Sequence, residues 1–213
     1  ITLESLIQRC EVIDIGIDGG GLDDLLGLTV AGREKDTRRW LTWSHAWAHE
    51  SVLERRKSEV SKLYDFQKEG DVTIISRVGQ DVEEVAEICS MVEKSNLLDK
   101  IGVDPHGLGG ILDALAESGI PAEKIIGISQ GWKMAGAIKT AERKLAEKVL
   151  WHGGTGLMAW CVGNAKVIPQ GNAVNITKQV SGSAKIDPLM ALFNAITLLS
   201  LNPEGQGGSF WDN

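Results

Sequence analysis

Residues 12–18 read VIDIGID and lead directly into Gly19-Gly20-Gly21. The β-branched, apolar run that stops at a glycine loop predicts a buried strand ending in Asp18. A carboxylate at a strand end, beside a loop without side chains, can be reached by a phosphate or a metal ion. A turn aspartate that accepts backbone N–H bonds fits the same pattern. Asp18 is therefore a candidate ligand whose role depends on what else reaches it.

The residues that follow predict an antiparallel meander. Residues 25–33 and 38–47 have strand character and are separated by the turn-like Glu34-Lys35-Asp36. Residues 49–68 are polar with apolar side chains at roughly helical spacing, and residues 72–76 predict a short strand. With residues 12–18, the first two segments form three consecutive strands.

Beyond residue 80 the pattern alternates between helix and strand. We expect helices at residues 82–92, 108–117, 134–149 and 188–201, and strands at 98–103, 124–128, 165–169 and 173–178. The helix at 188–201 is apolar on nearly every side, so it should be buried. A meander followed by this alternation predicts an α/β fold, a mixed sheet with helices on both faces.

The composition is that of a globular domain, with 43% hydrophobic and 24% charged residues in 213. No apolar run is long enough to span a bilayer, so no membrane partner is expected. Cys10, Cys89 and Cys161 are too few and too far apart for a disulfide framework or a zinc ribbon, which favours a reducing compartment. The net charge of −7 argues for weak binding to nucleic acid, unless bound cations neutralise some of the acidic residues.

Two further aspartates occupy positions like that of Asp18. Asp104 follows the strand at 98–103, and Asp187 opens the last helix; each precedes a proline. Taken singly, each could be a helix N-cap. Taken together, two strand-end aspartates and one at the start of a helix that packs on the sheet suit Mg²⁺ or Mn²⁺, which prefer oxygen ligands. Two such ions about 4 Å apart can cleave a phosphodiester.

Three residues are accessory candidates. Asp24 lies just after the glycine loop and could reach the metal site, or could be an exposed loop acid. His106 could bind metal or orient water, or could be a loop histidine without a role. Lys185, two residues before Asp187, could contact the scissile phosphate, or could be a solvated lysine.

An ordered series of motifs resembles one known family. Its members are Ile17-Asp18 with Asp24, Val103-Asp104-Pro105, Ile128-Ser129-Gln130-Gly131, the helix from Met134, His152-Gly153-Gly154, Trp160, Asn164, Lys178, and Lys185-Ile186-Asp187 with Ala191 and Ala195. Together they resemble the C-terminal nuclease domain of the large terminase subunit of tailed bacteriophages. The resemblance covers nearly the whole chain.

The resemblance implies a ribonuclease-H-like fold and a metal-dependent endonuclease that cuts concatemeric double-stranded viral DNA during genome packaging. It implies Asp18, Asp104 and Asp187 as the acidic triad, with two Mg²⁺ or Mn²⁺ ions as cofactors. It also implies double-stranded DNA, the terminase small subunit and the portal protein as partners, in the cytoplasm of the infected bacterial host.

The family pairs this domain with an N-terminal packaging ATPase, and this chain lacks the G-x-x-x-x-G-K-[ST] phosphate loop. We therefore expect one nuclease domain over residues 1–201, a mobile tail over 202–213, and the ATPase absent from this chain.

Two other functions compete. Ile15-Gly16-Ile17-Asp18-Gly19-Gly20-Gly21 looks like the first phosphate loop of sugar-kinase and actin-like ATPases, although no second Asp-x-Gly-Gly loop follows. The second alternative is a catalytically inactive ribonuclease-H-like module that docks onto another packaging protein.

Overall fold

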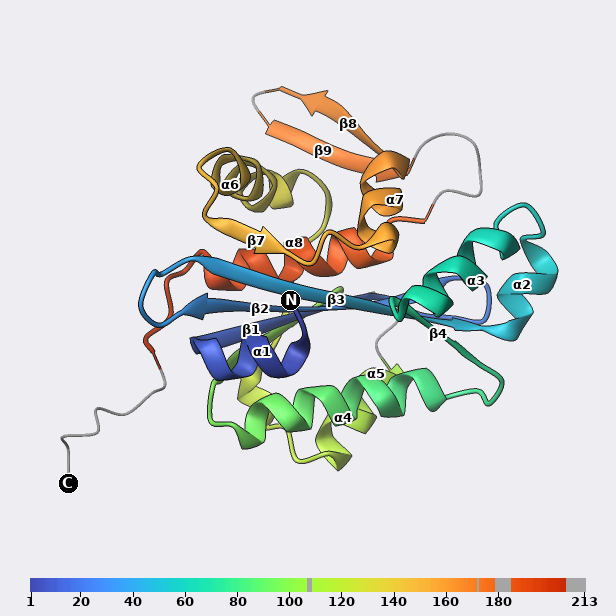
Figure 1. Cartoon of the computed structure of the whole chain (residues 1–213), viewed down its shortest axis with the longest axis horizontal. Coiled ribbons are helices and arrows are strands. Elements are labelled where there is room, and N and C mark those ends of the chain that lie inside the picture. The colour runs from blue at the N-terminus through green and yellow to red at the C-terminus, as the bar shows by residue number, and fades with distance from the viewer. Residues whose placement is uncertain (107–108, 172, 179–184, 206–213) are drawn as a thin grey trace.

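A mixed β-sheet forms the centre of the molecule (Figure 1). The computed structural model describes residues 1–106, 109–171, 173–178 and 185–205. Within these residues the main sheet has seven strands in the order β4-β3-β2-β1-β5-β6, and β7 also pairs with β3. The predicted mixed sheet is confirmed.

The meander is the first part of the sheet. Strands β1 (Cys10–Gly19), β2 (Leu25–Glu34) and β3 (Trp40–His49) pair antiparallel in sequence order. Every residue of β2 is buried, as expected for a strand covered on both faces. The strands predicted at 12–18, 25–33 and 38–47 are thus confirmed, with ends that differ by one or two residues.

The remaining strands of this sheet add in parallel. Strand β5 (Leu98–Val103) pairs with β1, and β6 (Ile125–Gly127) pairs with β5. On the other side, β3 pairs with β7 (Leu150–His152) near its start and with β4 (Val72–Ile75) near its end. Because β1, β3, β4, β5 and β6 run in one direction, their carboxyl ends meet at one edge of the sheet.

Helices cover both faces. Helices α1 (Leu3–Arg9), α4 (Gln80–Lys94) and α5 (Gly109–Glu117) lie below the sheet in Figure 1. Above it lie α8 (Asp187–Leu199), then α6 (Ala135–Ala146), α7 (Gly156–Asn164) and the hairpin of β8 (Ala165–Gln170) and β9 (Ala173–Lys178). Each face has its own apolar core. The two-faced helical cover predicted from the alternation is confirmed.

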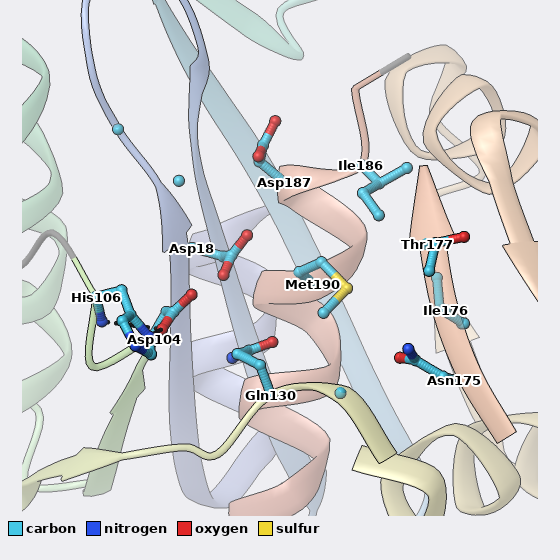
Figure 2. A pocket seen from close by; sticks show the side chains of 13 residues that line it. Asp18, Asp104, His106, Gln130, Asn175, Ile176, Thr177, Ile186, Asp187 and Met190 are labelled. Carbon is cyan, nitrogen blue, oxygen red and sulfur yellow. Dashed lines mark hydrogen bonds and ion pairs between the residues drawn. The ribbon is translucent and has the colours of Figure 1, made fainter. Parts of the chain in front are cut away.

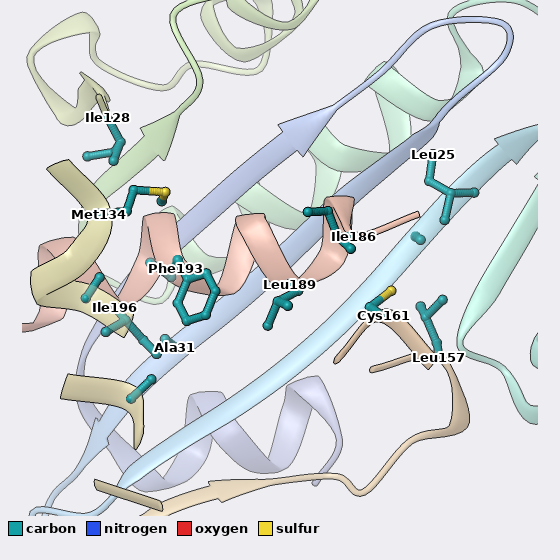
Figure 3. Packing of buried hydrophobic residues seen from close by; sticks show 14 of the residues in the cluster. Leu25, Ala31, Ile128, Met134, Leu157, Cys161, Ile186, Leu189, Phe193 and Ile196 are labelled. Carbon is teal, nitrogen blue, oxygen red and sulfur yellow. The ribbon is translucent and has the colours of Figure 1, made fainter. Parts of the chain in front are cut away.

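Helix α8 lies directly on the sheet because glycines leave room for it. A Cβ on Gly16 would be 1.9 Å from the Ala191 carbonyl oxygen, and a Cβ on Gly27 would be 2.7 Å from the Pro188 nitrogen. Large α8 side chains, Leu189, Phe193 and Ile196 among them, fill the core on the outer side of the helix (Figure 3). The helix is buried on nearly every side, as its sequence predicts.

Some elements differ from the sequence prediction. The helical spacing over residues 49–68 divides into α2 (Glu50–Arg55) and α3 (Val60–Glu69). The His49 side chain accepts a hydrogen bond from the Ser51 N–H and so caps α2. The segment 134–149 begins as a 3-10 turn, η2 (Gly131–Met134), before α6. Another 3-10 turn, η1, spans Ala122–Lys124. Strand β7 is not predicted by its sequence.

Asn202 and Pro203, after α8, are held by Arg33, whose Nη1 and Nη2 donate 2.7 Å hydrogen bonds to the Asn202 side chain and the Pro203 carbonyl oxygen. Of the tail predicted over 202–213, residues 206–213 lie outside the described residues. Leu108 in the predicted helix and Asn172 in the predicted hairpin turn also lie outside them. Within the described part of the chain, no helix has the length and apolar character that crossing a bilayer requires.

Candidate active site

A pocket of about 470 Å³ lies where the carboxyl ends of β1 and β5 meet the N-terminus of α8 (Figure 2). It is lined by Asp18, Gly19, Gly20, Asp104, His106, Gln130, Gly131, Asn175, Ile176, Thr177, Ile186, Asp187 and Met190. The three aspartates predicted as ligands therefore line one pocket, although they come from positions up to 169 residues apart in the sequence.

Each aspartate reaches the pocket from a different element. Asp18 is the penultimate residue of β1, Asp104 follows β5, and Asp187 is the first residue of α8. Asp18 and Asp187 are buried, whereas the Asp104 side chain is 27% exposed. Figure 2 shows Asp18 between the other two. The N-cap alternative does not describe Asp187, because Ile186 holds that position, or Asp104, because α5 begins only at Gly109.

The glycine loop determines how close Asp187 comes to β1. Gly19 has a φ of +86°, and a Cβ on it would lie 3.0 Å from the Asp187 Cβ and 2.2 Å from the Leu25 carbonyl oxygen. A side chain at position 19 would therefore push the start of α8 away from Asp18. The glycine loop after Asp18 therefore allows Asp187 to lie close to β1 and also leaves Asp18 accessible from solvent.

The carboxylates share the pocket without forming a compact cluster. Within the described ranges, no three His, Cys, Asp or Glu side chains are close enough to hold one metal ion together. Neighbouring carboxylates repel one another when no cation lies between them. Mg²⁺ keeps several water ligands and needs only one or two carboxylates, so a site of this openness is compatible with it.

The donor groups fit a hard divalent cation. Besides the carboxylates, the polar side chains that line the pocket are the amides of Gln130 and Asn175, the Thr177 hydroxyl and the exposed imidazole of His106. The nearby thiol of Cys161 is fully buried, and burial together with the Asp187 charge raises its pKa, so it stays protonated. A thiolate ligand that would select a softer metal is therefore absent from the described pocket lining.

His106 lies beside Asp104, as its position in the sequence suggests. Its backbone N–H donates to the Asp104 Oδ1 at 3.0 Å, and its Nδ1 lies 3.0 Å from the same oxygen. The His106 side chain is 90% exposed, so it stands at the mouth of the pocket. These contacts fix the turn that follows β5.

Lys185 and Asp24 bind each other. The Lys185 side chain is only 2% exposed; its Nζ donates to the Asp24 carboxylate and, at 2.9 Å, to the Asp23 carbonyl oxygen. Neither residue lines the pocket. Ser51 and Arg56 donate to the carbonyl oxygens of Leu22 and Asp23. These contacts tie the β1–β2 loop to α2 and to the segment that leads into α8.

Sequence reasoning gave no role to several pocket residues. Gln130 donates to the Asn194 side chain at 3.2 Å, and Asn194 in turn donates to the Ile17 carbonyl oxygen at 2.8 Å. Asn194 is fully buried. A polar residue within the apolar helix at 188–201 is the sequence signal for this connection. Asn175 and Thr177, on β9, carry no such signal because only the folding of the hairpin over the pocket brings them there.

The fold is thus a mixed sheet with acidic residues at the carboxyl ends of two central strands and a third carboxylate at the start of a helix that packs on the sheet. The model of the family "Terminase large subunit, endonuclease domain" matches residues 8–202. The chain belongs to this family, as its motif series predicts, and its fold is ribonuclease-H-like.

Solved structures agree with this fold. The chain is similar to the large terminase of bacteriophage HK97, with 19% identity and a TM-score of 0.72, over 93% of this chain and 43% of that one. It is also similar to the large terminase nuclease of the thermophilic phage G20c with bound magnesium, with 14% identity and a TM-score of 0.52, over 87% of this chain and 80% of that one.

Among curated proteins, Protein YmfN of Escherichia coli (strain K12) is 24% identical over 161 residues, which are 75% of this chain and 34% of YmfN. The chain thus spans about a third of YmfN and less than half of the HK97 protein. The family match disfavours the sugar-kinase and actin-like alternative.

Proposed function

We propose that this chain is a divalent-metal-dependent endonuclease module that hydrolyses phosphodiester bonds in double-stranded DNA, with Asp18, Asp104 and Asp187 as the metal ligands. The observation that carries this proposal is the convergence of these three carboxylates, from β1, β5 and α8, on one pocket. The G20c nuclease structures with bound magnesium and with bound cobalt support a divalent cation in this family.

The protein supplies the ligands and their positions. Asp18, Asp104 and Asp187 would hold the cations, which when bound would supply activation of a water molecule and stabilisation of the leaving oxygen. Asp18 is held on a buried central strand, and Asp187 is held by the close packing of α8 on that strand. Asp104 is oriented by the backbone N–H of His106. We propose that the exposed His106 imidazole orients Asp104 or a water molecule at the mouth of the pocket.

The N-terminus of α8 adds a favourable field. Helix α8 is 13 residues long and begins at the pocket, so its partial positive charge favours the approach of a phosphate group. We propose that Lys185 and Asp24 act by holding the β1–β2 loop against this helix start. In this proposal neither residue touches the DNA or the metal.

In the wider proposal, residues 1–201 act as one nuclease domain of a longer packaging protein that also carries the ATPase. The module would cut concatemeric viral DNA in the cytoplasm of the infected host, working with the terminase small subunit and the portal protein.

The direct test compares two aspartates on the same strand. Asp18→Asn removes a proposed ligand, whereas Asp14→Asn makes the same substitution at a buried aspartate four residues earlier that does not line the pocket. With supercoiled plasmid and Mn²⁺, Asp18→Asn should lower the cleavage rate more than about 100-fold, since even partners of metal ligands cost 10- to 100-fold. Asp14→Asn should cleave like the wild type. Equal cleavage by Asp18→Asn and the wild type would refute the ligand assignment.

Metal binding can be measured without catalysis. Millimolar Mn²⁺ should stabilise the wild type, by about 2.7 kcal/mol when its concentration is 100 times Kd. The melting temperature of the wild type should therefore rise. Asp18→Asn and Asp187→Asn should lose most of this increase. A wild type that is stabilised by Mn²⁺ yet leaves the plasmid intact would favour the inactive docking module instead.

A further inference from the structure

The charge of this acidic protein is unevenly distributed along the chain. Residues 130–186 contain eight Lys and Arg residues but only two acidic ones, Glu142 and Glu147. This segment therefore has a formal charge of +6, which leaves −13 on the rest of a chain whose total is −7. The weak DNA binding suggested by the net charge consequently does not apply to every surface.

The positive segment forms one layer of the structure. Residues 130–186 include η2, α6, β7, α7, β8 and β9, most of which lie above α8 in Figure 1. We call them the basic layer. Its basic residues, with Lys148 between α6 and β7, are Lys133, Lys139, Arg143, Lys144, Lys148, Lys166 and Lys178, whereas Lys185 of the same segment is buried against Asp24. Lys133, Lys139 and Lys166 are exposed, on η2, α6 and β8 respectively.

The opposite face has the opposite charge. Residues 80–123, which include α4 and α5, contain ten acidic residues and two basic ones. This face would repel a phosphate backbone. A polyanion is therefore directed to the other side of the sheet, because attraction by Lys and Arg dominates non-specific binding to DNA.

Exposed aromatic side chains accompany the basic ones. Trp132 is 57% exposed with the Lys133 ammonium 5.9 Å from its ring centroid, and Trp151 is 42% exposed with the Arg39 guanidinium 4.5 Å from its centroid. A cation–π contact stabilises each pair, and both rings remain accessible on this side of the sheet.

The basic layer is continuous with the pocket. Gln130 and Gly131, at the start of η2, and residues 175–177 of β9 line the pocket. In Figure 2, Asn175, Ile176 and Thr177 lie across the pocket from Asp18 and Asp104. Lys133 is two residues beyond that wall. A polyanion on the basic layer can therefore reach the three carboxylates without crossing the acidic face.

We propose that the basic layer is the surface on which duplex DNA lies, with Lys133, Lys139 and Lys166 contacting backbone phosphates and the scissile bond entering the pocket beside η2 and β9. This inference takes its substrate, DNA, from the proposed function. It adds the surface that binds the DNA, which the assignment of the three aspartates does not define.

The test uses two triple variants of equal charge change. Lys133→Gln/Lys139→Gln/Lys166→Gln alters the basic layer, and Lys35→Gln/Lys68→Gln/Lys94→Gln alters exposed lysines elsewhere. Binding of a 30-base-pair duplex is measured by fluorescence anisotropy in EDTA from 50 to 200 mM KCl. The first variant should bind about tenfold more weakly or worse, with a salt slope lower by about 2 to 3, since each phosphate contact contributes about 0.9. The control should bind like the wild type.

Equal affinities for the two variants, or a larger loss in the control, would overturn the proposed surface, as would a wild type that does not bind DNA at 50 mM KCl. Hydrolysis of bis(p-nitrophenyl) phosphate with Mn²⁺ separates this result from failure of the nuclease proposal, because so small a diester needs no extended surface. The basic-layer variant should retain that activity. If the wild type lacks it yet shows the predicted difference in DNA binding, the surface stands and the nuclease proposal fails.

Discussion

The two helical layers that cover the sheet differ both in charge and in how closely they approach it. Below the sheet, α4 and α5 pack through large side chains such as Ile13, Ile15 and Ile17 on β1. Above it, α8 comes within backbone contact of β1 and β2, because Gly16 and Gly27 have no side chains. The difference shows that one face serves as a scaffold, while the other positions the pocket and carries the positive charge.

The largest effect should come from filling the space between α8 and the sheet. Gly16→Ala places a methyl group 1.9 Å from the Ala191 carbonyl oxygen, and a backbone atom cannot turn aside as a side chain can. We expect a loss of about 4 kcal/mol or more in the free energy of unfolding. Ile15→Val, on the adjacent residue facing the other layer, should cost about 1 kcal/mol. Equal losses of unfolding free energy for the two variants, measured by urea unfolding, would contradict the proposed difference between the two helical layers.

The next effect concerns the pair that joins the β1–β2 loop to the α8 layer. Asp24→Ala leaves the Asp23 carbonyl oxygen as the acceptor that remains for the buried Lys185 ammonium within the described residues, so we expect a loss of about 3 kcal/mol. Lys185→Met should cost less, because the Asp24 side chain is 29% exposed and can be hydrated. Chemical denaturation of both variants measures the difference, and the reverse order of stabilities would show that the pair is not the anchor of the loop.

A smaller effect should appear in the pH dependence of stability. Burial, with a contribution from Asp99, raises the pKa of Asp14 from 3.8 to about 8. The folded state therefore binds more protons than the unfolded state between these values, so stability should fall as pH rises from about 4 to 8. Asp14→Asn should remove this decline and so stabilise the protein relative to the wild type at pH 8. Melting temperatures from pH 5 to 9 would test this; parallel curves for the two proteins would exclude it.

Much of the sheet could be predicted because its signals are local. The apolar runs in 12–18 and 25–33 and the turn residues between them each determine structure over a few residues. Strand β7 could not be predicted, since three residues form a strand only where β3 is available for pairing. The break between α2 and α3 is likewise set by the loop that α2 binds rather than by its own spacing.

The pocket was predicted in part for a related reason. Asp18 and Asp104 mark strand ends, so the shared edge of parallel strands brings them together. The position of Asp187 depends on α8, whose close packing requires the glycines of other elements. Asn175 and Thr177 reach the pocket only through tertiary contacts, and a single sequence has no pattern that reports these.

The backbone contact between α8 and β1 also has a consequence for motion. The backbone of α8 contacts the sheet directly at Gly16 and Gly27. Because no side chains lie between them at these positions, the helix cannot tilt or slide without disrupting the core around it. The amide hydrogens of α8 should therefore exchange with solvent only when the whole domain unfolds, at the slowest rate in the protein. The edge of the β8–β9 hairpin, paired only within itself, should exchange far sooner. The α8 wall of the pocket should therefore stay closed until the domain unfolds, whereas the β8–β9 wall should open and close many times before that happens.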